Sequence, residues 1–149
     1  MNTNQPSTHD RLKQEAAALF ARRGYGGTSM AEIADRVGIR KASLYNYYDS
    51  KADLMFELLE RSLTDWARAC EVEVPAEASV EEKLAAYLTA AVRFGRDNPQ
   101  AIGIIRQAVG QIPRDLRQRV HDTVNRHEEV WLGALRELFN EAIEHGEVE

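Results

Sequence analysis

The chain has 149 residues, a formal net charge of -5 and a single cysteine, Cys70. One cysteine excludes an internal disulfide framework and any site built from several thiolates, and the acidic total is not that of a generally basic nucleic-acid binder. No apolar run approaches the length of a membrane span, and the first residues lack a signal peptide's basic and apolar regions. We therefore expect a cytoplasmic protein that makes no membrane contact.

The apolar pattern predicts an all-α fold, because no stretch shows sustained period-two alternation and Pro and Gly fall at plausible helix ends. We predict a disordered arm over residues 1 to 9. A first helix starts near the end of this arm and runs to Arg23, with one apolar face made of Leu12, Ala16, Leu19 and Phe20.

Residues 28 to 51 predict two short helices joined by a tight turn. The first carries apolar residues at i, i+3, i+4 and i+7, namely Met30, Ile33, Ala34 and Val37. Ser29 is placed to cap this helix, and Gly38 follows its last apolar residue, where a left-handed residue ends a helix at little cost. The second helix begins near Arg40 or Lys41, and its inward pair is Leu44 and Tyr48.

The outward face of the second helix favours DNA recognition, since it combines small, hydrogen-bonding and cationic side chains that suit base edges in the major groove. Lys41 can donate to guanine, Ala42 and Tyr45 can pack on thymine methyl groups, and Ser43 can bond to several base edges. Lys51 stands at the start of the next helix, where we expect it to bind a phosphate. The predicted DNA-binding residues are Thr28, Ser29, Arg40, Lys41, Ala42, Ser43, Tyr45, Asn46, Tyr47 and Lys51.

This stretch resembles the N-terminal DNA-binding domain of the TetR family of bacterial transcriptional repressors. The resemblance covers about residues 10 to 60 and rests on Ala17, Leu19, Phe20, Gly24, Tyr25, Thr28, Ser29, Ile33, Ala34, Val37, Gly38, Ile39, Leu44, Tyr45, Tyr47, Tyr48, Lys51 and Leu54. It implies a repressor that binds operator DNA as a homodimer and is released by a small-molecule effector. One departure is Arg40, where the family usually has Ser or Thr, so we expect the second helix to lack a side-chain cap.

Charge is divided unevenly along the chain. Residues 1 to 51 hold eight Lys or Arg and five Asp or Glu, a net +3, whereas residues 52 to 149 hold eleven and nineteen, a net -8. This division is expected if only the first part meets phosphates, although chance differences between solvated faces would also produce it. We predict a helix-turn-helix domain over residues 10 to 55 and a helical regulatory domain over residues 56 to 149.

A longer helix at residues 51–70 is predicted to join the two domains. Further helices of the regulatory domain are predicted at residues 79–98, 101–109 and 113–145. A largely apolar effector pocket between them is predicted from Tyr87, Phe94, Ile105, Arg106, His127 and Trp131. The alternative is that these aromatic residues simply fill the core.

Family members usually continue for two further helices, which form the dimer interface. We expect that interface to be missing here, so the regulatory domain is predicted to be incomplete at its C-terminus and homodimers to be weak. The apolar stripe of the helix that follows Pro113 is then the best remaining dimer surface.

No pattern predicts catalysis, a metal site or a cofactor. The sequence lacks a phosphate-binding loop and a nucleophile elbow, and His121 and His127 are six residues apart, so they do not share a helix face. We expect no enzyme. The alternative to a DNA-binding regulator is a helical protein-interaction module that no longer binds DNA.

Overall fold

The computed structural model describes residues 6–71, 75, 78–144 and 146, without the side chains of residues 128–132 and 134. All regular secondary structure in this part of the chain is helical, which confirms the predicted all-α class. The helices are α1 (Thr8–Arg23), α2 (Met30–Val37), α3 (Lys41–Leu44), α4 (Lys51–Cys70), α5 (Val80–Asp97), α6 (Pro99–Gln111) and α7 (Arg117–Glu144), with a 3-10 turn η1 (Arg114–Leu116) before α7. None of them is long and apolar enough to cross a membrane over the described residues.

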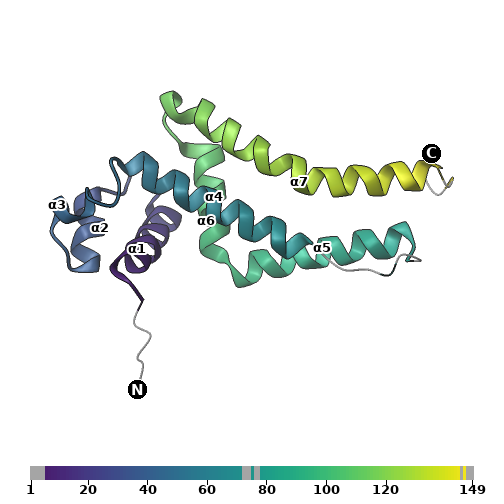
Figure 1. Ribbon diagram of the computed structural model, residues 1–149, viewed down its shortest axis with the longest axis horizontal. Coiled ribbons are helices and arrows are strands. Elements are labelled where there is room, and N and C mark those ends of the chain that lie inside the picture. Colours follow the sequence, from purple (N-terminus) through teal and green to yellow (C-terminus); the bar gives the residue numbers. More distant parts are fainter. Residues whose placement is uncertain (1–5, 72–74, 76–77, 145, 147–149) are drawn as a thin grey trace, which may run out of the picture.

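The molecule is elongated, with a small head at one end (Figure 1). The head consists of α1, α2, α3 and the first turns of α4, and α4 continues from it into the body. Helix α6 crosses behind α4, whereas α5 and the second half of α7 extend side by side to the opposite end.

Serine side chains mark several helix starts. The Ser50 and Ser79 hydroxyls accept the backbone N–H groups of the third residues of α4 and α5, and Ser79 forms a complete capping box with Glu82. Ser7 caps α1 in the same way, so α1 begins at Thr8. The predicted arm is therefore too long, because residues 7 to 9 belong to the cap and first turn of α1; residues 1 to 5 lie outside the described part.

The hydrophobic core does not stop at the predicted boundary between residues 55 and 56. Buried side chains of α1, α2 and α4 form one cluster with Ile104 and Ala108 of α6, with Ile112 just after α6 and with Val120 of α7. Helix α4 runs through the boundary unbroken and buries Met55 and Phe56 on either side of it. Head and body thus share a core, while the division into two domains stays a prediction.

Helix α6 packs against α1 at unusually close range. A Cβ placed on Gly103 would lie 2.6 Å from the Cβ of Ala21 and 3.1 Å from its Cα. One turn further along α6, the buried side chain of Gln107 faces Gly24 at the end of α1. The absence of a side chain at Gly103 therefore sets the distance between the head and α6.

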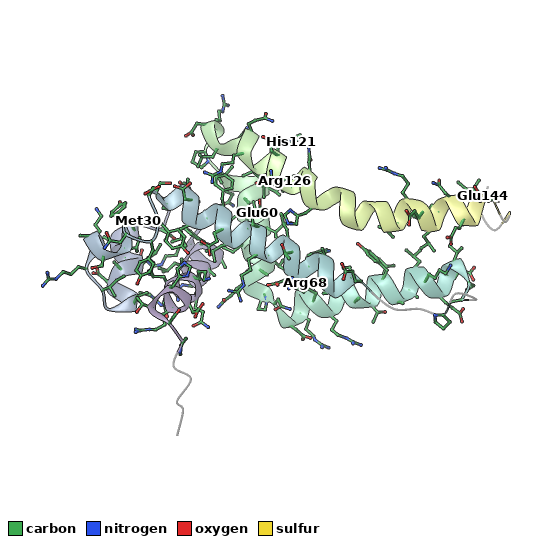
Figure 2. The ribbon with its side chains drawn as sticks, viewed as in Figure 1. Met30, Glu60, Arg68, His121, Arg126 and Glu144 are labelled. Carbon is green, nitrogen blue, oxygen red and sulfur yellow. The ribbon has the colours of Figure 1, made fainter. Side chains whose placement is uncertain are left out.

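Polar contacts join α4 to α7. Arg119 donates to Asp53 at 2.8 Å, and its guanidinium lies 4.0 Å from the centroid of the Phe56 ring. The hydrogen bond from the Ser50 hydroxyl, and then that from Arg119, hold the pKa of the Asp53 carboxyl below its usual value. Further along, Arg126 pairs with Glu60 where α7 passes over α4 (Figure 2).

We predict that Gly103→Ala lowers the free energy of unfolding by about 1–3 kcal/mol, because the added methyl group forces α1 and α6 apart. The control is Gly133→Ala in α7, where a Cβ would meet nothing within 4 Å. That change should raise the free energy of unfolding by up to about 1 kcal/mol, since it only removes a flexible residue from a helix. Urea unfolding of both variants measures the difference, and a gain for both would contradict the close approach.

Candidate nucleic-acid interface

Helix α2 and the turn after it follow from local rules. The Ser29 hydroxyl accepts the backbone N–H of Glu32, and the predicted apolar stripe from Met30 to Val37 is buried. Gly38 adopts a φ of 78°, which places its N–H toward the carbonyls of Ala34 and Asp35. This left-handed turn is favourable for glycine, and it directs the chain into α3.

Helix α3 is a single turn that depends on its apolar anchors. It spans only Lys41–Leu44, and its preceding residue, Arg40, makes no side-chain cap, as the sequence predicts. Leu44 is fully buried and Tyr48 is 5% exposed, so the predicted inward pair is confirmed. A helix of this length has no stability of its own in water, so the packing of these two side chains holds the segment in place.

The opposite side of this segment faces solvent. Tyr45 is 43% exposed and Tyr47 is 47% exposed. Ser43 is half-buried, whereas the remaining residues of the predicted recognition face are exposed, namely Arg40, Lys41, Ala42 and Asn46. The Lys41 ammonium lies 5.9 Å from the centroid of the Tyr45 ring. We call the surface formed by residues 40–43 and 45–47 the α3 surface.

The Arg and Lys side chains of the head differ in whether they are paired with neighbouring groups. Arg23 pairs with Glu32 and Arg36 with Glu15, while Arg11 donates to the carbonyl of Val37. Arg22 at the end of α1 and Arg40 and Lys41 at the start of α3, in contrast, make no ion pair with any described residue. Of these, Arg40 and Lys41 lie where a helix that enters a groove by its first turn presents its charge to a phosphate or a base.

Thr28 does not belong to the solvent-facing surface. Its side chain is 2% exposed, and its hydroxyl donates to the carbonyl of Gly24 at 2.9 Å. This bond closes the loop between α1 and α2. The prediction of Thr28 as a DNA contact is therefore wrong for its side chain, while Ser29 beside it remains exposed as the cap of α2.

Lys51 points inward from the first turn of α4. Its Nζ donates to the carbonyl oxygens of Tyr25 and Thr28 at 2.7 and 2.8 Å, and it lies 4.2 Å from the centroid of the Tyr25 ring. Burial lowers the pKa of this ammonium. Two of its three N–H groups are thus used within the protein, and the residue ties the α1–α2 loop to α4 instead of standing open to a phosphate.

The predicted effector residues do not line one described cavity. Phe94 packs against Trp66 with ring centroids 5.7 Å apart, whereas Ile105 packs against the shared core and Arg106 is exposed. Burial is the main cause that raises the pKa of Tyr87 to about 12, with Cys70 beside it. The side chain of Trp131 lies outside the described part.

His127 contacts α4 and its own helix. Its Nδ1 donates to the carbonyl of Thr123 at 3.0 Å, and its Nε2 lies 3.3 Å from the Thr64 hydroxyl and 3.4 Å from Glu60. The residue is therefore part of the α4–α7 contact. Over the described residues, no group of three or more His, Cys, Asp or Glu side chains is placed to hold a metal ion.

A groove of about 680 Å³ lies along the end of α4 and along α5. Ala69 of α4 and Ala85, Ala86 and Ala90 of α5 give it an apolar lining of small side chains, and Phe94 is the one predicted effector residue beside it. Arg93 and Asp97 add opposite charges to its wall. The sequence does not predict this groove, because the groove depends on how α5 packs against α4.

The head and its α3 surface define an all-helical protein with a helix-turn-helix, and comparison with known proteins gives the family. A family model described as bacterial regulatory proteins of the tetR family matches residues 14–58. Among solved structures, the TetR family transcriptional regulator PfmR from Thermus thermophilus aligns with a TM-score of 0.73 and 28% identity, over 97% of this chain and 76% of that one. The chain belongs to the TetR family.

Curated relatives match the chain in part of their length. It is 30% identical over 121 residues to the HTH-type transcriptional repressor KstR2 of Rhodococcus jostii, which covers 80% of this chain and 59% of that protein. It is 44% identical over 64 residues to the repressor of the same name from Mycolicibacterium smegmatis, which covers 42% of this chain and 31% of that protein. The chain thus spans less than two thirds of both relatives.

We predict that Lys51→Met lowers the free energy of unfolding by about 1–3 kcal/mol, because it removes charged hydrogen bonds to two carbonyls and leaves these acceptors without their partner. Lys41→Met is the matched control, since Lys41 is exposed, and it should change stability by less than about 0.5 kcal/mol. Urea unfolding measures both. Unchanged stability of the Lys51 variant, together with a salt slope of DNA binding lowered by about one, would instead show a phosphate contact.

Proposed function

We propose that the chain is a transcriptional regulator that binds duplex DNA through the α3 surface. The observation that carries this proposal is the exposure of Arg40, Lys41, Ala42 and Asn46 on a segment whose opposite side is anchored by Leu44 and Tyr48. Unpaired cations, small side chains and an amide on a fixed backbone suit a groove that displays acceptors, donors and methyl groups. The names of the curated relatives support repression as the mode of action.

We further propose that two copies bind together. One helix of four residues reads few base pairs, and regulators of this kind read two half-sites about 34–36 Å apart. On α7, Phe139 is 46% exposed and Ile143 is 60% exposed, one helical turn apart. This apolar pair supports the long helix as the contact between copies.

Selection of binding sites from a pool of random duplexes tests DNA binding and pairing together. A regulator enriches a common sequence, and a pair of copies enriches two inverted half-sites with their centres about one helical turn apart. A single short site would show that one copy binds alone. The absence of any enrichment, with no salt-dependent binding, would favour a protein-interaction module instead.

We predict that Lys41→Ala weakens binding to the selected duplex by about 1–3 kcal/mol and relaxes the preference at one base step, because a donor to base acceptors is lost. A repeat of the selection with the variant measures the preference. Arg22→Ala is the control, since Arg22 is also an exposed cation of the head but lies at the end of α1. An unchanged base preference in the Lys41 variant would contradict base reading by Lys41.

The effector is the least constrained part of this function. We propose that a small, largely apolar molecule binds in the groove beside Phe94. The alanine side chains of the groove are small enough to leave room for such a molecule, and they give it an apolar surface to contact. A screen of small apolar and cationic compounds for those that raise the unfolding midpoint and release the selected duplex identifies candidates.

We predict that Ala90→Phe abolishes the response to such compounds, because the larger ring fills the groove. Binding of the selected duplex without compound should stay unchanged, which serves as the internal control. Retained response in the variant would place the effector elsewhere.

A further inference from the structure

His9, in the first turn of α1, reaches the chain just beyond α3. Its ring stacks against Tyr47 with centroids 5.6 Å apart and planes 12° from parallel, and against Tyr48 with centroids 5.7 Å apart. Its Nε2 lies 2.9 Å from the Tyr48 hydroxyl oxygen. The histidine therefore contacts both the buried anchor of the α3 segment and an exposed tyrosine of the α3 surface.

The hydrogen bond to Tyr48 holds the His9 ring in place. It joins Nε2 to the hydroxyl of a residue that is 5% exposed, so the partner is itself fixed by burial. Glu57 of α4 lies on the same side, and burial, followed by this carboxylate, raises the pKa of Tyr48. Lys13 lies 3.5 Å from Glu57 and compensates its charge.

Tyr47 lacks the support that Tyr48 has. Its backbone N–H donates to the carbonyl of Leu44 at 2.9 Å, which holds the main chain, but its ring is nearly half exposed and extends beyond the core of the head. Among the described aromatic pairs, Tyr47 appears only in the stack against His9. Stacking of two flat rings restricts the side-chain torsions that would otherwise vary.

We propose that His9 is a positioning residue for DNA recognition: held by Tyr48 and Glu57, its ring fixes Tyr47 in the orientation in which the α3 surface meets DNA. This inference rests on the proposed DNA-binding function. It adds a residue from α1 to a surface that the helix-turn-helix pattern confines to residues 28 to 51, and His9 was not among the residues predicted from sequence.

The test compares three variants on the duplex selected by the wild-type protein and on a scrambled duplex of equal composition. His9→Ala removes ring and donor, His9→Phe keeps a ring that can stack, and His9→Gln keeps a donor without a ring. Fluorescence anisotropy measures affinity, and tyrosine ring resonances in the NMR spectrum report the environment of Tyr47 without DNA.

We expect His9→Ala and His9→Gln to weaken binding to the selected duplex by about three- to tenfold. This factor corresponds to the interaction free energy of a single aromatic pair. His9→Phe should retain most of the affinity, and its Tyr47 resonances should stay closest to wild type. A purely structural role for His9 would lower stability without this separation between the Phe and Gln variants.

Two negative results have different meanings. If the wild-type protein binds the selected duplex and all three variants match its affinity, the role of His9 is overturned while DNA binding stands. If the wild-type protein enriches no duplex at all, the proposed function fails and the role of His9 fails with it.

Discussion

The burial of Leu44 and Tyr48 is the constraint on which the DNA-facing part of this molecule depends. Helix α3 has one turn and no side-chain cap, so neither helix propensity nor capping can hold it. Its position comes from two side chains seated in the core of the head, supported from α1 and α4 through the Tyr48 hydroxyl. The exposed side of the segment can therefore be small and polar, because it has no packing role.

Local rules account for the parts of the head that the sequence predicted well. The cap at Ser29, the left-handed Gly38 and the inward pair of α3 each depend on residues a few positions apart. Such patterns are visible along one chain, because helix geometry places i, i+3 and i+4 on one face. The same rules, and the spacings shared with the TetR family, gave the fold class.

The misplaced residues depend on contacts between distant parts of the chain. Lys51 stands at a helix start, which suits a phosphate, but the loop carbonyls that take its protons come from residues 25 and 28. Thr28 stands next to an exposed cap, yet its hydroxyl is used to close the loop to Gly24. His9 offers only a weak signal in sequence, since its partner Tyr48 is 39 residues away. The predicted effector site stays a prediction for a related reason: helix periodicity gives inward faces but not which helices meet.

Helix α4 links the head of the molecule to its body. Its first turn carries Lys51, which holds the α1–α2 loop, and Asp53, which bonds to Arg119 of α7. The next turn carries Glu57, which supports Tyr48, and the one after carries Glu60, which pairs with Arg126. Any shift of α7 along α4 must stretch or replace the bonds at Asp53 and Glu60, and the shared core leaves little room for α4 to move without the head. The face that binds α7 and the face that supports α3 thus belong to the same three turns of one helix.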